Sequence, residues 1–329
     1  MNIRLIELLR SAESDWVSSE VLRQPSGVSR TAISKQIKSL LAMGYEIESS
    51  TRKGYRLLRD LDGLQANLIQ PFLEGTRFAS GRYEYKEATT STNNDVRQLG
   101  EEGAPEGSLV FAEVQEEGRG RRGRVWFNRA GDCLQFSVLL RPPVAPQQAT
   151  LIPLLAATSV YRALQNMGVK DVAIKWPNDV LIRNRKVCGV LCEMSVDMEG
   201  IQYAILGIGL NVNTPGERFP KELWDIACSL ASETGKTWRR SELLIAILKE
   251  MDAQLTLAWR GEIQPILEAW REGAHTLGKT IRVEMPNGEV LEGSAEDVNE
   301  QGALLVRDSS GKLHILHSGE VSLGTGSET

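Results

Sequence analysis

The stretch that decides how this chain folds and works spans residues 118–126 and reads Gly118-Arg119-Gly120-Arg121-Arg122-Gly123-Arg124-Val125-Trp126. Its glycines give the backbone positive-φ freedom and let it approach a ligand closely. Its arginines offer planar forks of donors that fit phosphate and carboxylate groups. The stretch therefore predicts a loop that folds around a small anion, and chemistry on a phosphorylated or carboxylated molecule.

Two alternatives exist for this loop taken alone. Its glycines match the G-x-G-x-x-G fingerprint of dinucleotide-binding folds, but that fingerprint opens a helix and has an acidic residue about 20 positions further on. Here Val125 to Phe127 are typical of extended chain, and the region near position 141 reads Leu-Leu-Arg-Pro-Pro. The second alternative, a flexible arginine loop that is exposed or grips nucleic acid, stays open at this point.

Two more strings carry polar groups in a specific pattern. Residues 175–179 read Lys-Trp-Pro-Asn-Asp, and the proline stops a strand so that Asn178 and Asp179 lie on a turn. Lys186 then enters a new strand in which Gly189 permits close approach. Residues 89–94 place hydroxyls and amides at an expected helix N-terminus. Such groups suit the uncharged polar head of a ligand that carries both hydrogen-bond donors and acceptors. Each string is common by itself; together they are specific.

The first 60 residues are locally basic. They hold ten Lys and Arg against seven Asp and Glu, a balance of +3 in a chain whose total is −5, so the remainder carries −8. Within 29–59 the count is seven basic against two acidic residues. A basic module on an acidic body indicates an anionic partner for that module alone.

The same region has the pattern of a winged helix-turn-helix. We expect helices over 3–10, from Ser18 or Ser19 to Gln24, and from a cap at Ser29, with a turn at 25–27, a stop at Gly44 and a hairpin over 45–57. This order, with basic and hydroxyl residues early in the third helix, favours DNA binding over a merely solvated face. The expected DNA-binding residues are Ser29, Arg30, Thr31, Ser34, Lys35, Lys38 and Lys53.

The rest of the chain mixes strands and helices. After a linker over 58–68 we expect strands at 109–114, 134–140, 180–182, 187–194 and 203–211, and helices near 92–101, 150–167, 241–259 and 263–272. From Gly278 onward the sequence changes to short strands separated by Asn287-Gly288 and Ser310-Gly311 turns. Some fifty residues of this kind predict a small SH3-like β-barrel.

Bulk properties exclude several classes of protein. No apolar run of about 18 residues occurs, so we expect no membrane span. The four cysteines form no Cys-x-x-Cys pair and are expected to be reduced in a cytoplasmic protein, and no metal-ligating residues are expected.

Taken together, the strings make the chain resemble the biotin protein ligases over nearly its whole length. The resemblance rests on Ser91-Thr92-Asn93, Gln115 with the 118–123 loop, Trp126, Lys175 to Asp179, and Lys186 with Gly189. The helix-turn-helix makes it similar to the bifunctional subgroup, which is both ligase and biotin operon repressor. The fold implied is α+β: a winged helix-turn-helix over 1–62, an SH2-like α/β catalytic domain over 69–274, and an SH3-like barrel over 276–329.

The resemblance also implies the chemistry. Such enzymes join biotin to ATP, with Mg²⁺, to give biotinoyl-5′-AMP and pyrophosphate, and then transfer biotin to a lysine of a biotin carboxyl carrier protein. In the bifunctional subgroup the adenylate promotes a homodimer that binds operator DNA. Because biotin's carboxylate and the α-phosphate are both anions, a site rich in cations fits the reaction.

By resemblance, particular residues receive roles. Biotin-binding residues are Ser91, Thr92, Asn93, Gln115, Arg119, Gly120, Arg121 and Lys186. Nucleotide-binding residues are Arg121, Arg122, Arg124, Trp126, Lys175 and Asn178, with Trp126 stacked on adenine and Trp224 bordering the same pocket. Catalytic residues are Arg121 and Lys186, beside the new acyl phosphate, and Asp179, which orients or deprotonates the acceptor lysine.

Three other functions remain as alternatives: a monofunctional biotin ligase without DNA-binding activity, a lipoate ligase of the same fold, and a biotin-sensing transcription factor without enzymatic activity. The arginine-glycine loop and the helix-turn-helix argue against the lipoate ligase, and Lys186 argues against the inactive sensor.

Overall fold

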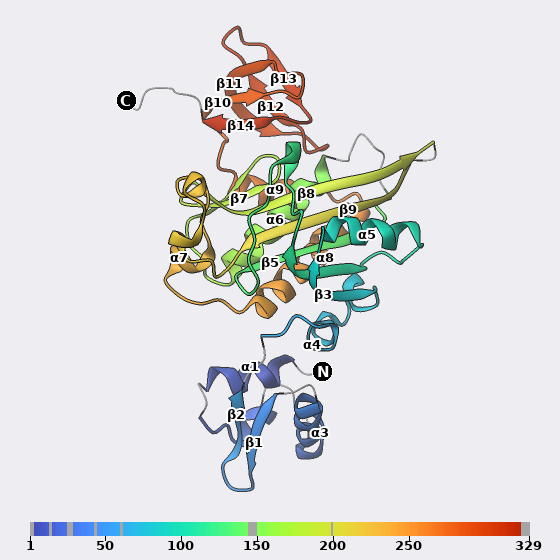
Figure 1. The fold of residues 1–329 in the computed structure, drawn as a ribbon, viewed down its shortest axis with the longest axis vertical. Helices are drawn as coiled ribbons and strands as arrows, with labels where there is room; N and C mark the ends of the chain where they lie inside the picture. Colours follow the sequence, from blue (N-terminus) through green and yellow to red (C-terminus); the bar gives the residue numbers. More distant parts are fainter. Residues whose placement is uncertain are drawn as a thin grey trace. The chain divides into compact units, whose positions relative to one another are not determined.

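A computed structural model describes residues 3–12, 15–24, 29–42, 45–59, 62–143, 150–198 and 200–323. The chain divides into two compact units, Met1–Glu74 and Gly75–Thr329 (Figure 1). Among the described residues, none of the helices combines the length and the apolar character needed to cross a membrane.

The smaller unit has the predicted order of elements. It contains α1 (Ile3–Ser11), α2 (Ser19–Arg23), α3 (Arg30–Ala42), the antiparallel hairpin β1 (Glu46–Ser50) and β2 (Gly54–Arg59), then α4 (Ala66–Ile69) and the 3-10 helix η1 (Gln70–Leu73). Ser18 caps α2 through Val21 N–H, and the Ser29 hydroxyl accepts from Ala32 N–H at the start of α3. The turn predicted at 25–27 and the stop at Gly44 lie outside the described residues.

Apolar spacing explains how this unit packs. Ile33, Ile37 and Leu40 of α3 are buried, as their helical spacing predicts, and they share a core with Leu9 and Leu22. A backbone bridge from Val17 to Tyr55 fixes the hairpin. The three helices and the wing expected from the sequence are therefore confirmed.

The larger unit is built on a seven-stranded mixed sheet. Its spatial order is β3-β4-β5-β9-β8-β7-β6, in which only β3 and β4 are parallel. The strands are β3 (Tyr83–Thr89), β4 (Leu109–Gln115), β5 (Cys133–Leu140), β6 (Val172–Lys175), β7 (Asp179–Ile182), β8 (Arg185–Asp197) and β9 (Gly200–Asn211). The sequence analysis had not predicted β3, whereas β6 matches the strand that it expected to stop before Pro177.

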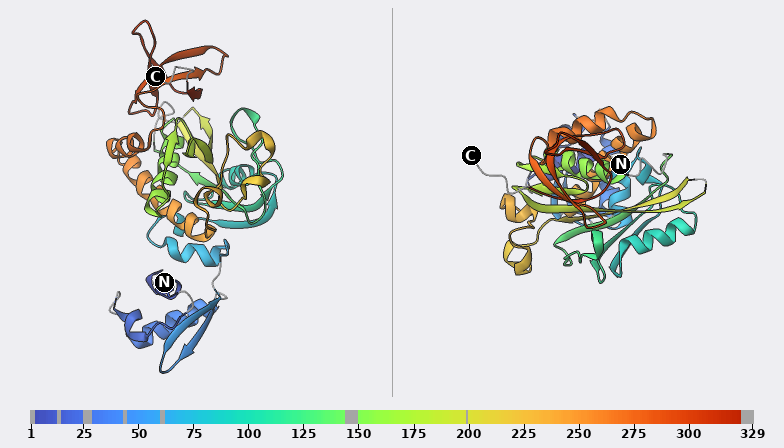
Figure 2. Two further views of the ribbon diagram at one scale, coloured as in Figure 1. Left: turned by 90° about the vertical axis from the view of Figure 1, so that its left-hand side faces the viewer. Right: turned by 90° about the horizontal axis from the view of Figure 1, so that it is seen from above.

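Helices cover the two faces of this sheet unequally. α5 (Thr92–Glu101) packs on β4, β5 and β9 from one side, whereas α6 (Leu151–Asn166), α8 (Arg240–Trp259) and α9 (Gln264–Gly273) form a layer on the other (Figure 2). The short helices are η2 (Arg77–Ala79), η3 (Arg121–Gly123), η5 (Gly216–Arg218), η6 (Lys221–Leu223) and α7 (Leu230–Thr234). Because α5 is short, part of the sheet face on which it packs stays uncovered.

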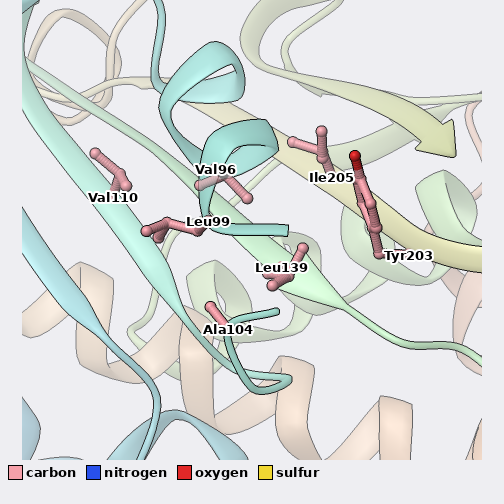
Figure 3. Close-up of a cluster of buried hydrophobic side chains, with 7 residues drawn as sticks. All are labelled: Val96, Leu99, Ala104, Val110, Leu139, Tyr203 and Ile205. Carbon is pink, nitrogen blue, oxygen red and sulfur yellow. The ribbon is translucent and has the colours of Figure 1, made fainter. Parts of the chain in front are cut away.

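The apolar cluster beneath α5 shows where the covered part ends. Val96 and Leu99 of α5 lie against Leu139 of β5 and Tyr203 and Ile205 of β9 (Figure 3). Successive residues of a strand alternate between faces, so Gly207 and Gly209 continue the row of Tyr203 and Ile205. The side chains that would fill the uncovered face are thus absent.

The C-terminal strands form a five-stranded antiparallel sheet. They are β10 (Thr280–Glu284), β11 (Val290–Val298), β12 (Leu304–Arg307), β13 (Leu313–Leu316) and β14 (Glu320–Leu323), in the order β13-β12-β11-β10-β14. Within the described part of the chain, no pairing joins the edge strands β13 and β14, because β14 pairs with β10. The predicted sheet is present, but the strand pairings do not close it into a barrel.

We predict that Leu139→Ala lowers the free energy of unfolding by about 2–5 kcal/mol, because it removes buried methyl groups and leaves a cavity under α5. Leu139 is 0% exposed. Urea unfolding followed by tryptophan fluorescence measures the change. The matched control Met198→Ala, at a fully exposed position, should stay within about 0.5 kcal/mol of the parent. Equal effects of the two substitutions would contradict the packing described here.

Candidate active site

A single cavity of about 580 Å³ gathers the residues that the sequence singled out. It lies in the larger unit and opens over the uncovered part of the sheet. Every residue predicted for biotin, nucleotide or catalysis lines it: Ser91, Thr92, Asn93, Gln115, Arg119, Gly120, Arg121, Arg122, Arg124, Trp126, Lys175, Asn178, Asp179 and Lys186. These residues come from strings up to about a hundred positions apart.

Glycines make the floor of the cavity. A Cβ added at Gly209 would lie 2.5 Å from Cε2 of Trp126, and one at Gly189 would lie 3.1 Å from its Cζ3. Gly189 and Gly209 are register partners on β8 and β9. The indole of Trp126 therefore lies on bare backbone, with Lys186 Nζ 5.7 Å from its ring centroid.

The arginine loop is a folded hairpin. Arg119 and Val125 form an antiparallel bridge, and Gly120 N–H donates to Arg124 O at 2.7 Å. At its tip, Arg122 and Gly123 have φ of 55° and 72°, where glycine is the favoured residue. No dinucleotide-type helix follows, because residues 125–128 continue as extended chain. The dinucleotide prediction is therefore wrong.

Two of the loop's arginines are paired with carboxylates of the C-terminal sheet. Arg122 donates to Glu284 Oε1 at 2.7 Å and to the carbonyl oxygens of Glu284 and Met285. Arg124 pairs with Glu320 at 2.5 Å. Burial raises the pKa of Glu320, but bonding to Arg124 and the charges of both arginines outweigh it and hold the pKa below its usual range. Glu320 is therefore charged at neutral pH.

Arg121 has a different environment. Its guanidinium donates to Asn178 Oδ1 at 3.1 Å and to Gly319 O at 3.2 Å, both neutral acceptors. Burial lowers its pKa, while the charge of Asp179 acts in the opposite sense, and an arginine remains protonated in either case. Within the described ranges, Arg121 forms no salt bridge, so it presents a partly desolvated positive charge to the cavity.

Lys186 and Asp179 lie beside it. Lys186 Nζ is 2.6 Å from Asp179 Oδ1, and the two residues sit on neighbouring strands β8 and β7. Asp179 begins β7, although the sequence analysis had expected it on a turn. An anion entering the cavity would compete with Asp179 for the ammonium group.

The far end of the cavity is polar and uncharged. Ser91 is the N-cap of α5, but its hydroxyl makes no capping bond. The side-chain oxygen of Gln115 accepts from the N–H of Thr92 at 2.8 Å and from its hydroxyl at 3.0 Å. Ser91 and Thr92 are nearly inaccessible to solvent, and Gln115 is half-buried. They suit a ligand head that carries both donors and acceptors.

The sequence analysis missed part of the wall. Residues of the 212–227 loop, of the α9–β10 junction and of β14 also line the cavity: Phe219, Leu223, Asp225, Ile226, Ala227, His275, Thr276 and residues 319–323. These positions carry no motif, so only the tertiary structure reveals them. Trp224, which was expected to border the pocket, is not among the lining residues, and its indole N–H donates to Phe219 O at 2.8 Å.

The predicted DNA-binding residues lie on the surface of the smaller unit. Ser29, Arg30, Thr31, Lys35 and Lys38 are exposed at and along α3, Ser34 is half-buried, and Lys53 is exposed in the wing. Arg56 of β2 is already engaged, since its guanidinium stacks 5.0 Å from the Trp16 ring centroid and pairs with Glu48. The wing's accessible cations are therefore Arg52 and Lys53.

Comparison with known proteins agrees with this arrangement. The biotin/lipoate A/B protein ligase family matches residues 85–211, the biotin protein ligase C-terminal domain matches 276–324, and a helix-turn-helix domain matches 3–56. The bifunctional ligase/repressor BirA of Bacillus spizizenii is 34% identical over 320 residues, covering 97% of this chain and 98% of that protein. That of Escherichia coli is 29% identical over 322 residues, covering 98% and 96%.

A solved structure shares the fold of the larger unit. A biotin protein ligase from Aquifex aeolicus, in complex with biotin and ATP, aligns at a TM-score of 0.63 with 31% identity, over 74% of this chain and 98% of that one. The chain thus belongs to the biotin protein ligase family and carries the helix-turn-helix of its bifunctional ligase/repressors. The identity predicted from the motifs is confirmed.

We predict that Gly209→Ala slows adenylate formation about ten- to hundredfold, because a Cβ at this position overlaps the indole of Trp126. Pyrophosphate release with biotin and ATP measures the rate. Gly216→Ala is the matched control, since its nearest non-neighbouring atom would be 4.0 Å away. A normal rate for Gly209→Ala would show that the position of Trp126 does not matter.

Proposed function

We propose that this chain uses ATP to activate biotin as biotinoyl-5′-AMP and then transfers biotin to a lysine of a biotin carboxyl carrier protein. The observation that carries the proposal is the charge distribution in the arginine loop. Arg122 and Arg124 are neutralised by Glu284 and Glu320, whereas Arg121 faces the cavity with neutral partners only. A site built this way attracts an anion to one defined position.

The first step joins two anions. An oxygen of biotin's carboxylate attacks the α-phosphorus of ATP, the bond to the bridging oxygen breaks, and pyrophosphate leaves. Two unit charges 4 Å apart repel by about 4 kcal/mol at an effective dielectric constant of 20. Arg121 and Lys186 offset this repulsion, and they stabilise the charge on the pentavalent phosphorus more than the charges of the separate reactants.

The second step is acyl transfer. The amine of the acceptor lysine attacks the acyl carbon of the adenylate, and AMP leaves. Asp179, which contacts Lys186 in this structure, orients the incoming lysine or accepts its proton once Lys186 is bound to the anion. Mg²⁺ accompanies ATP and neutralises phosphate charge. The phosphates themselves would hold the ion, since among the described residues no group of three or more His, Cys, Asp or Glu could hold a metal.

The binding roles follow the shape of the cavity. We assign Ser91, Thr92, Asn93 and Gln115 to the biotin head, and Arg119, Gly120, Arg121 and Lys186 to its tail and carboxylate. Lys175, Asn178, Arg122, Arg124 and Trp126 are assigned to the nucleotide. The open face of the Trp126 indole suits a planar ring such as adenine. We retain the three domains 1–62, 69–274 and 276–329 as the functional units of a cytoplasmic protein.

We further propose that the smaller unit represses biotin genes. One small helix-turn-helix binds weakly, so an adenylate-promoted homodimer that places two α3 helices on a palindrome gains affinity from both half-sites. This disfavours the alternative of a monofunctional ligase, in which the exposed cations of α3 would have no partner. The relatives named above are biotin ligases, which also disfavours lipoate as the substrate.

Incubation with biotin, ATP, Mg²⁺ and a carrier domain should add the mass of one biotinoyl group to the carrier, measured by mass spectrometry. Lys186→Ala should reduce the rate of adenylate formation about 10²- to 10³-fold, because one charge-stabilising donor is lost. Lys170→Ala, an exposed lysine away from the cavity, is the matched control and should react normally. An unmodified carrier would refute the ligase, and full activity of Lys186→Ala would refute the role of that side chain.

For DNA, we expect biotin plus ATP to increase both the dimer population in sedimentation and the affinity for a palindrome selected from a random pool. Replacing Lys35 and Lys38 with alanine should weaken binding and reduce the salt slope by about 2, which corresponds to two lost phosphate contacts. Ser39→Ala, exposed on the same helix, serves as the control. If neither adenylate nor these lysines affect binding, only the enzyme remains.

A further inference from the structure

The groups facing the biotin head are held from behind by a chain of buried side chains. Asn93 of α5 donates from Nδ2 to Glu193 Oε2 at 2.6 Å. Its other amide atom, Oδ1, accepts from the hydroxyl of Ser137 on β5 at 2.6 Å. Ser137 Oγ in turn lies 2.7 Å from Thr92 Oγ1. Ser137 is 0% exposed, so water does not compete for these bonds.

The chemistry of each group fixes the direction of the chain. A carboxylate only accepts, so Glu193 turns the amide of Asn93 with its nitrogen outward and its oxygen toward Ser137. The guanidinium groups of Arg97 and Arg119 lie 3.2 and 3.9 Å from the carboxylate of Glu193. The single proton of Ser137 is then used by Asn93 Oδ1. Ser137 faces Thr92 as an acceptor.

The hydroxyl of Thr92 therefore has one proton and two neighbouring oxygens that can accept it. Ser137 Oγ is at 2.7 Å and Gln115 Oε1 at 3.0 Å. If the Thr92 proton pointed into the cavity, the lone pairs of Thr92 Oγ1 would face those of Ser137 Oγ and Gln115 Oε1 with no hydrogen between them, which is unfavourable. The proton stays inside the wall, and Thr92 presents a lone pair to the ligand.

Gln115 is oriented by the same wall. Its Oε1 accepts from the N–H of Thr92, a backbone group that can only donate, so the amide cannot turn over. Its Nε2 donates to Gln135 Oε1 at 3.0 Å, and Gln135 is held by Asn128 and by Glu113 O. The cavity end thus offers defined acceptor and donor positions.

The backbone is also shaped for this chain. A Cβ added at Gly207 would lie 2.3 Å from Oδ1 of Asn93, so the amide occupies the space that a side chain on β9 would take. Both polar atoms of that amide face the wall, where Glu193 and Ser137 hold them. Asn93 therefore links Glu193 to Ser137 and orients the hydroxyl of Ser137.

We propose that Glu193, through Asn93 and Ser137, fixes the Thr92 hydroxyl as a hydrogen-bond acceptor, and that this polarity selects a ring carrying an N–H donor at that point. Glu193, Asn93 and Ser137 are positioning residues of the biotin subsite. The inference rests on the proposed function, because the N–H it reads is that of biotin's cyclic urea. An oxygen in place of this N–H would face the lone pair of Thr92 and be rejected.

The test compares biotin with its two cyclic carbamates, in each of which one ureido N–H is replaced by oxygen. Adenylate formation gives kcat/KM for each ligand, and the ratio is the discrimination factor. The parent protein should discriminate against one carbamate about a hundredfold. Glu193→Gln lets the amide of Asn93 and the amide of the introduced glutamine turn over. Ser137 can then donate to Thr92, which frees the Thr92 proton from Ser137, so this discrimination factor should fall about tenfold. Ser137→Ala removes one of the two acceptors of the Thr92 proton but leaves Gln115 Oε1 at 3.0 Å, so the factor should fall less than in Glu193→Gln, while KM for ATP stays within about twofold.

Controls separate polarity from structure. Arg97→Gln removes an ion pair of Glu193 on the partly exposed side and leaves the chain intact, so the discrimination factor should change less than about threefold. Glu193→Gln is the safer variant, because the side chain of Glu193 is 28% exposed, whereas Ser137 lies in the core. The inference would be overturned if Glu193→Gln lowered kcat/KM equally for biotin and the carbamates, or if it left the discrimination factor unchanged. Failure of the parent protein to adenylate biotin at all would instead overturn the proposed function.

Discussion

Bare backbone on one face of the larger sheet makes the rest of the site possible. At Gly189, Gly207 and Gly209 the strands β8 and β9 carry no side chain, and the indole of Trp126 and the amide of Asn93 rest directly on them. Interiors are close-packed, so even one methyl group at these positions would displace a functional side chain. The same row of β9 continues to Ile205 and Tyr203, which pack in the apolar cluster under α5 (Figure 3).

The four arginines of the 118–126 loop differ in their electrostatic surroundings. Four of them lie within six residues, yet their surroundings differ: Arg119 bonds Asn94, Arg121 bonds neutral oxygens, and Arg122 and Arg124 bond carboxylates of the C-terminal sheet. A loop with four unpaired cations would repel itself. Pairing two of them with Glu284 and Glu320 relieves that repulsion and holds the hairpin in place.

These pairs give the C-terminal sheet a direct part in the cavity. Gly319, just before β14, supplies its carbonyl oxygen to Arg121, β14 supplies Glu320 to Arg124, and residues 319–323 line the wall. Trp176 Nε1 also donates to Gly302 O at 3.0 Å, which ties the Lys175–Asp179 turn to the same sheet. A substitution in this sheet is therefore expected to affect ligand binding through the loop.

Local patterns were enough to predict most elements. Apolar spacing and the cap at Ser29 predicted α3, and α8, β5 and β9 were also expected from the sequence, because such local signals depend on residues close in sequence. The short strands β3 and β14 were missed, since a strand of four to seven residues is stabilised by its neighbours in the sheet more than by its own sequence.

For the site, the sequence by itself determined which chemical groups are present and that three distant strings belong together. It did not determine which arginine keeps an available charge, that Trp224 is not among the residues lining the cavity, or that Ser137 and Glu193 support Thr92. Those features depend on contacts between residues far apart in the chain. The reason is physical: the charge and hydrogen-bonding state of a side chain depend on what surrounds it in space, and only the folded chain fixes those surroundings.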